Sequence, residues 1–143
     1  MSLVKRAIQI RDRDQSVDEA WCIFDVEWPK QHPNLIEALS LAKAHNIPVA
    51  LSNPAFEVWL ILHLRQQNAH INTDRAVSLR RELDGSTDKH LDPSIYLPHR
   101  GLAAHRANVL AQTHSRNKSA VPHNNPSSNA FELMAAIEQG RPF

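Results

Sequence analysis

The chain has 143 residues, of which 42% are apolar and 22% charged, and its formal net charge is +1. This composition is typical of one globular domain and excludes collagen, a coiled coil and a disordered tail. The most apolar run, residues 55–64, is far shorter than the roughly 20 residues that cross a bilayer, so we expect no membrane association.

Charge and cysteine content limit the function only loosely. Residues 1–63 hold 6 basic and 8 acidic side chains, and residues 64–143 hold 10 and 7. A moderately basic second half suits a polyanion, but a solvated helix surface produces the same imbalance. The single cysteine, Cys22, lies in an apolar run typical of a buried, reduced thiol, and charged residues rather than a secretory leader open the chain. We therefore expect a cytoplasmic location.

The first predicted elements are a helix and a strand. Residues 3–15 have the apolar periodicity and the charge of a short amphipathic helix. Residues 20–24 form a continuous apolar run, which predicts a buried strand. Asp25 and Glu27 follow directly, so two acids stand at the carboxyl end of this strand.

A second strand follows after a helical crossover. Residues 34–45 predict an amphipathic helix, and residues 47–51 predict another buried strand, closed by Ser52 and Asn53. Two strands joined in this way are parallel, so their carboxyl ends meet at one edge of the sheet. In open α/β folds that edge is where ligands bind.

The rest of the chain is mainly helical. Residues 54–67 predict a helix capped by Asn53 with Pro54 at its first position, and apolar residues on nearly every face indicate that it is buried. Residues 114–127 predict a loop. Further helices are predicted over residues 74–84, 100–112 and 128–139.

These elements predict one α/β domain over residues 1–143. We expect an α/β core part in residues 1–67 and a mainly helical part in residues 68–143. Only two strands are recognisable, and a two-stranded parallel sheet is too small to be stable alone. Either strands are missing from the chain or a partner supplies them.

The acids at the shared strand edge are the main candidates for chemistry. Asp25 and Glu27 occupy alternate positions of an extended segment and so point the same way, as two ligands of one Mg²⁺ would. Glu57 approaches from the next helix. The alternative is structural: Asp25 and Glu27 are loop acids, and Glu57 only complements the helix dipole.

His63 is a further candidate. It lies six residues after Glu57, about 120° further round the helix, so the two side chains do not share a face. A single histidine on a buried helix is more often a hydrogen-bonded core residue than a catalytic one. The other histidines show no zinc spacing, and the 3 glycines form no phosphate loop, so we expect neither zinc nor ATP binding.

Basic residues in the second half are candidates for contact with a nucleic-acid backbone, because guanidinium groups pair well with phosphate. The alternative is a solvated helix face. The residues concerned are Arg75, Arg80, Arg81, Arg100, Arg106, Arg116 and Lys118.

Three blocks of the sequence resemble the RloB-like family. They are residues 21–27 (WCIFDVE), residues 52–63 (SNPAFEVWLILH) and residues 125–129 (NPSSN), and the similarity extends from about residue 17 to residue 137. The resemblance implies a Toprim-type α/β domain and a Mg²⁺- or Mn²⁺-dependent nuclease activity. It also implies an association with restriction loci and abortive phage infection.

The resemblance further implies roles for individual residues. In the Toprim pattern, an acid after the first strand joins an Asp-x-Asp pair that corresponds here to Asp25 and Glu27, with Glu in place of the second Asp. Glu57 and His63 are implied in catalysis, and a neighbouring ATPase is implied as a partner. The resemblance also suggests roles for Ser52 and Asn53. Together with the basic residues named above, the residues expected to contact nucleic acid are Ser52, Asn53, Arg75, Arg80, Arg81 and Asn125.

RloB-like proteins begin with a strand and a Glu-Gly turn that carries the first acid, whereas this sequence begins in the helix that follows. We therefore expect a Toprim-like parallel sheet with flanking helices that lacks its N-terminal strand. The expected function is phosphodiester cleavage in phage defence. The alternative is a catalytically impaired regulatory or scaffold subunit that binds the ATPase, and the sequence leaves homo-oligomerisation open.

Overall fold

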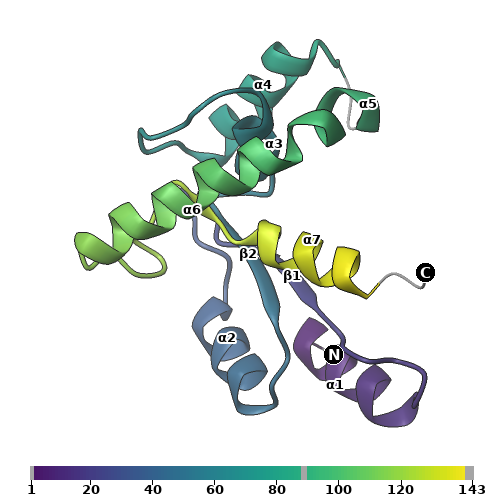
Figure 1. Ribbon diagram of the computed structural model, residues 1–143. Helices are drawn as coiled ribbons and strands as arrows, with labels where there is room; N and C mark the ends of the chain where they lie inside the picture. Colours follow the sequence, from purple (N-terminus) through teal and green to yellow (C-terminus); the bar gives the residue numbers. More distant parts are fainter. Residues whose placement is uncertain (1, 88–89, 141–143) are drawn as a thin grey trace.

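The computed structural model describes residues 2–87 and 90–140, which form an α/β fold with a mainly helical second half (Figure 1). This confirms the predicted fold class. The elements in chain order are α1 (Leu3–Arg13), β1 (Cys22–Asp25), α2 (Leu35–Ala44), β2 (Val49–Asn53), α3 (Glu57–Leu64), α4 (Thr73–Asp84), α5 (Pro93–Tyr96), the 3₁₀ helix η1 (Leu97–His99), α6 (Arg100–Arg116), β3 (Ser127–Ser128) and α7 (Ala130–Gln139).

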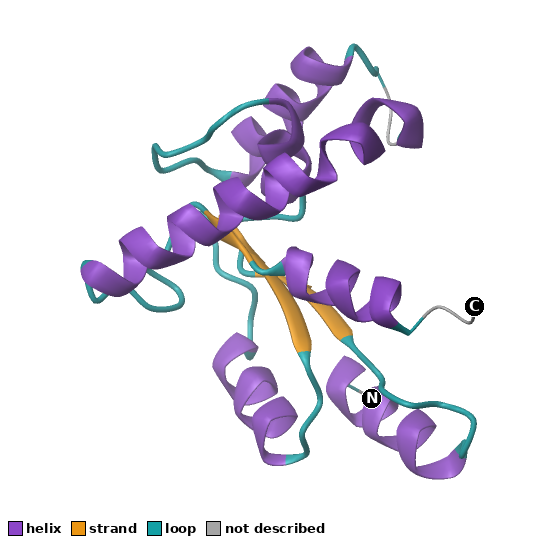
Figure 2. Ribbon diagram, in the orientation of Figure 1, coloured by secondary structure: helices purple, strands orange, loops and turns teal. Residues whose placement is uncertain are grey.

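A small mixed sheet lies at the centre of the molecule, with the strands in the order β1-β2-β3 (Figure 2). β1 and β2 are parallel, in a register that places Asp25 opposite Ser52, and α2 forms the predicted crossover between them. Their carboxyl ends point toward α3 and α6, whereas α1 and α2 lie nearer the opposite end of the strands (Figure 1). The strand edge predicted from the sequence is therefore present.

The short strand β3 lies where the sequence predicts the end of a loop and the start of a helix. Ser127 and Ser128 pair antiparallel with β2, and the hydroxyls of Ser52 and Ser128 lie 2.8 Å apart. The helix expected from residue 128 begins instead at Ala130. Two serines have no alternating apolar pattern, so only their pairing with a distant segment identifies this strand.

The start of α3 also differs from the prediction. The sequence predicts Asn53 as the cap and Pro54 as the first helical residue, but β2 continues to Asn53 and α3 begins at Glu57. The side-chain amide of Asn53 donates hydrogen bonds to the carbonyl of Pro122, at 3.0 Å, and to Oδ1 of Asn124, at 2.9 Å. Asn53 therefore holds a distant loop in place and does not cap the helix.

Two apolar clusters hold the elements together. The larger cluster surrounds α3, which packs against α4 and α6, and its residues Val58, Ile61 and Leu62 are fully buried, as the apolar faces of this helix predict. The smaller cluster joins α1, β1 and α2 and includes Val4 and the buried thiol of Cys22. Among the helices described, none has the length and apolar content to span a membrane.

Candidate metal centre

Asp25 ends β1 at the carboxyl edge of the parallel pair. Its Oδ1 accepts a hydrogen bond from the backbone N–H of Phe56, 2.9 Å away and one residue before α3 begins. The N-terminal end of a helix carries partial positive charge, so this position favours the ionised carboxylate. Within the described residues no hydrogen bond reaches Oδ2, which leaves this oxygen available to a ligand.

Burial and neighbouring negative charge oppose the ionisation of the same carboxyl group. Burial, and then the charges of Glu57 and Glu27, raise the pKa of Asp25 to about 6, although the N–H of Phe56 and the nearby His32 lower it. A bound divalent cation would remove this repulsion, because it favours the ionised form of every carboxylate around it.

Glu27 reaches the site by a different backbone path from the expected one. The sequence predicts an extended segment through residues 25–27, but Glu27 has a φ of 68°, in the left-handed region, and its N–H donates to the carbonyl of Pro54 at 2.7 Å. Asp25 and Glu27 nevertheless line one cavity of about 570 Å³. The two acids are brought together as expected, but not by strand alternation.

His32 lines the same cavity and was given no role by the sequence. Its backbone N–H donates to the carbonyl of Val26 at 2.8 Å, which folds the loop back over the end of β1. Its Nδ1 lies 2.8 Å from the carbonyl of Pro33 and donates to it. The sequence feature that could have identified His32 is its position five residues after Glu27, between Pro29 and Pro33.

The residues of this cavity fit a hard divalent cation bound by few protein ligands. Mg²⁺ prefers carboxylate oxygens, and it commonly keeps several waters and takes only one or two carboxylates. Asp25 and Glu27 meet that requirement. Within residues 2–87 and 90–140, no group of three or more His, Cys, Asp or Glu side chains is close enough for a fuller shell of protein ligands. Glu57 and His32 act on Asp25 in opposite directions, since the charge of Glu57 raises the pKa of Asp25 and that of His32 lowers it.

A family model of RloB-like proteins matches residues 1–137 of this chain. The chain belongs to the RloB-like protein family. No curated protein and no solved structure gives a significant match. The cavity around Asp25 lies inside the matched region.

In this RloB-like chain, three of the residues expected to contact nucleic acid are hydrogen-bonded inside the protein. Ser52 contacts Ser128, and Asn53 contacts the loop before β3, as described above. Asn125 is buried; its side chain accepts from the N–H of Ile71, at 3.1 Å, and donates to the carbonyl of Ile71, at 2.8 Å. These side chains hold β2 and the segment before β3 in place, and their contact with nucleic acid stays a prediction.

The three arginines of α4 are not gathered on one face of this helix. Arg75 is exposed and forms an ion pair with Glu82, at 2.8 Å. Arg80 is buried instead, with its side chain 4% exposed, and pairs with Asp84 at 2.8 Å. Arg81 is half-buried. Arg80 thus points into the protein, where the expected phosphate contact is out of reach, and the prediction is kept for Arg75 and Arg81.

His63 lies on the last turn of α3 and lines a different cavity from Asp25 and Glu27. Its Nδ1 lies 2.8 Å from the carbonyl of Trp59, and its ring packs edge-on against Trp59 and Tyr96, with centroids 4.7 Å and 5.5 Å away. Burial lowers the pKa of His63. These contacts match the alternative of a hydrogen-bonded core histidine, and a catalytic role for it stays a prediction.

Proposed function

We propose that this RloB-like chain is a Mg²⁺- or Mn²⁺-dependent nuclease that cleaves phosphodiester bonds of nucleic acid in the cytoplasm, in phage defence. The observation that supports this function most directly is the placement of Asp25 and Glu27 in one cavity, with Glu57 close enough to raise the pKa of Asp25. The cavity includes the carboxyl end of β1, and α/β sheets bind ligands at that edge of the sheet. The resemblance of the family to Toprim domains supplies the reaction class.

The residues of the site have separate tasks in this reaction. Asp25 and Glu27 would hold the cation, and the N–H of Phe56 fixes the orientation of Asp25. A bound divalent cation would stabilise negative charge on the phosphate and lower the pKa of the attacking water. The Glu57 carboxylate, at the start of α3, does not line this cavity, but its charge acts on Asp25, and we assign it the task of orienting that water and accepting its proton. His63 is left out of this scheme because it lines another cavity.

Cleavage assays on the full chain test this function. Single- and double-stranded DNA and RNA are incubated with Mg²⁺, Mn²⁺ or EDTA, using the wild type, Asp25→Asn and Glu57→Gln. Asp74→Asn is the matched control, since Asp74 is an exposed acid in the first turn of α4. We expect metal-dependent cleavage that is abolished by Asp25→Asn, reduced about 100-fold by Glu57→Gln and unchanged in the control. Cleavage that persists in EDTA or in Asp25→Asn would contradict the proposal.

We propose as a second candidate a regulatory or scaffold subunit that binds a partner ATPase and no longer cleaves. The small number of candidate metal ligands favours this second function: in the part of the chain that the structure describes, the acids form no group of three that could hold a metal ion. Stable co-purification with an ATPase of the kind that the family resemblance implies, without cleavage by either protein or by the pair, would support this alternative. Light scattering on the purified chain would show whether it forms a homo-oligomer.

A further inference from the structure

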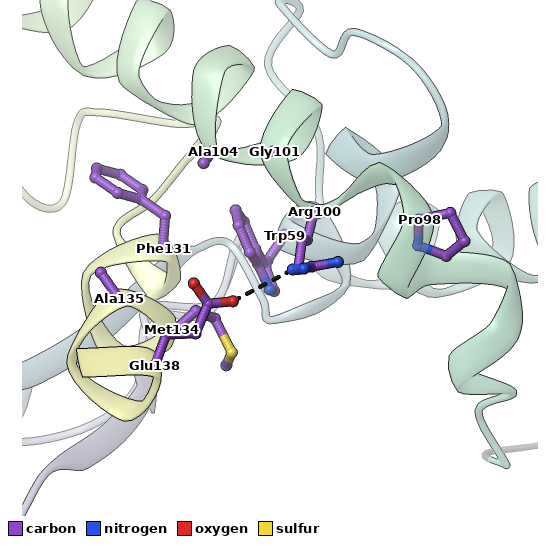
Figure 3. A pocket seen from close by; sticks show the side chains of 9 residues that line it. All are labelled: Trp59, Pro98, Arg100, Gly101, Ala104, Phe131, Met134, Ala135 and Glu138. Atoms are coloured by element: carbon purple, nitrogen blue, oxygen red, sulfur yellow. Dashed lines mark hydrogen bonds and ion pairs between the residues drawn. The ribbon is translucent and has the colours of Figure 1, made fainter. Parts of the chain in front are cut away.

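A cavity between α6 and α7 shares no lining residue with the cavity around Asp25 (Figure 3). Its volume is about 410 Å³, and its walls include Trp59 from α3, Ala104 from α6 and Met134 from α7. An adjoining cavity of about 400 Å³ shares Trp59 and Met134 and extends to His63. Cavities of roughly 300–1,000 Å³ are the usual size of small-molecule sites.

Two nearly buried side chains with polar atoms line this space: Trp59 lines both cavities, and His63 lines the adjoining one. Trp59 is 3% exposed and His63 is 5% exposed. Nδ1 of His63 lies 2.8 Å from the carbonyl of Trp59 and donates to it, so Nε2 is the ring nitrogen that can accept a hydrogen bond in the neutral form, which burial favours by lowering the pKa of the ring. Across the described residues, neither this nitrogen nor the indole N–H of Trp59 has a hydrogen-bond partner, and neither is among the fully enclosed unpaired atoms. The residues that line the two adjoining cavities therefore include one acceptor and one donor without a partner.

A pair of opposite charges lies at the mouth of the cavity. Nε of Arg100, on α6, lies 3.2 Å from Oε1 of Glu138, on α7, and these side chains are 58% and 54% exposed. Figure 3 shows this ion pair bridging the two helices beside Trp59. An exposed ion pair contributes little to stability, so a ligand can replace either partner at low cost.

We propose that these two adjoining cavities together bind a nucleotide, with the base inside and the phosphate at the mouth. The apolar faces of a nucleobase match the walls around Met134, and its edge carries neighbouring donor and acceptor groups for Nε2 of His63 and the N–H of Trp59. Arg100 pairs with the phosphate, since guanidinium and phosphate form strong hydrogen bonds, and Glu138 accepts from a sugar hydroxyl. An aliphatic ligand would leave the two polar atoms unpaired at a free-energy cost.

Calorimetric titration of the full chain in EDTA tests this site without the proposed metal centre. The probes are adenosine 5′-monophosphate, adenosine and a 5′-phosphorylated tetra-deoxyadenylate. Ala104→Leu fills the cavity, and Arg100→Ala removes the phosphate partner. Ala111→Leu is the matched control, because it makes the same change two turns further along α6 and Ala111 does not line this cavity. Circular dichroism checks that each variant is folded.

We expect adenosine 5′-monophosphate to bind the wild type and Ala111→Leu equally, and Ala104→Leu at least tenfold more weakly. Arg100→Ala should lower the affinity for the monophosphate to that for adenosine. Tighter binding of the tetranucleotide than of the monophosphate would assign the site to a nucleic-acid strand. Equal or weaker binding of the tetranucleotide would assign it to a free nucleotide. Absence of binding by any probe, or unchanged binding in Ala104→Leu, would overturn the proposal and leave the nuclease proposal untouched.

Discussion

The ionised carboxylate of Asp25 is stabilised by one neighbour in the candidate site, the N–H of Phe56, and destabilised by burial and by the nearby acids. The sequence identifies Asp25, because an apolar run that stops at two acids is visible without a structure. The sequence does not reveal the left-handed backbone of Glu27 or the position of His32. Both depend on contacts with other segments, with Pro54 in the first case and with the end of β1 in the second.

The raised pKa of Asp25 predicts a pH-dependent stability. Between the ordinary pKa of 3.8 and the folded value of about 6, the folded state binds more protons than the unfolded state, so stability falls as pH rises through this window. Asp25→Asn removes the charge and keeps an oxygen for the N–H of Phe56. After allowance for solvent screening, we expect it to raise the free energy of unfolding at pH 7 by about 1 kcal/mol. Urea unfolding at pH 4 and pH 7 measures this, and an equal loss of stability between these pH values in both proteins would contradict it.

Asp84 shows the opposite behaviour, in a buried ion pair. Its side chain is 2% exposed; it accepts hydrogen bonds from Arg80, at 2.8 Å, and from the hydroxyl of Tyr96, at 2.5 Å. Burial alone would raise the pKa of Asp84, but these bonds lower it below 3.8, so its stabilisation is present above that pH and lost as the pH falls further.

Removing this charge should destabilise the fold. Because Asp84→Asn removes the carboxylate that pairs with the buried Arg80, we expect a loss of about 3 kcal/mol at pH 7, measured by urea unfolding. The matched control is Glu82→Gln, on the same helix, where Glu82 is 59% exposed and pairs with Arg75. That change should cost less than about 0.5 kcal/mol. Equal effects of the two substitutions would show that the Asp84 pair is not buried in solution.

At the scale of elements, local pattern predicts the long helices and the two parallel strands but not the contacts that set their ends. Asn53 looks like a helix cap because its type and its position before Pro54 fit one. Its amide is used instead by the loop before β3, and β2 is extended to include it. The pairing of β2 with Ser127 and Ser128 crosses more than seventy residues, so no local pattern predicts it.

Asn125 should be essential for holding the segment that carries β3. Asn125→Ala leaves both the N–H and the carbonyl of Ile71 without their partner in the interior, so we expect a loss of about 3 kcal/mol in the free energy of unfolding. Asn108→Ala, at an exposed position of α6, is the control and should be neutral or slightly stabilising. Chemical unfolding of the two variants measures the difference. A loss in Asn125→Ala no larger than in the control would mean that these hydrogen bonds do not hold the segment.

At the scale of the whole molecule, the two apolar clusters differ in size. The cluster around α3 draws on α4 and α6, whereas the one that joins α1, β1 and α2 has few fully buried members. The second cluster also leaves apolar side chains uncovered, since Leu3 and Ile36 are each 50% exposed. The sequence indicates the burial of α3 but not this inequality, which depends on how the helices pack.

The difference in size between the two apolar clusters predicts that local stability differs between the helices around α3 and the helices α1 and α2. Helices with few buried apolar contacts open at lower free energy than those in a large core. In hydrogen exchange of the full chain, we expect amides of α3 and of the middle of α6 to be the slowest, and amides of α1 and α2 to exchange faster by at least about tenfold. Equal protection of α1 and α3 would show that the molecule opens as a single unit.

Asp25 and Glu27 are proposed to form a divalent-cation site, and calorimetric titration with Mg²⁺ and Mn²⁺ tests this most directly. The proteins are the wild type, Asp25→Asn, Glu27→Gln and the control Asp74→Asn, each checked for folding by circular dichroism. The wild type and the control should bind one cation, and the other two variants should lose binding. A folded wild type that binds neither cation, or binding that persists in Asp25→Asn, would contradict this account.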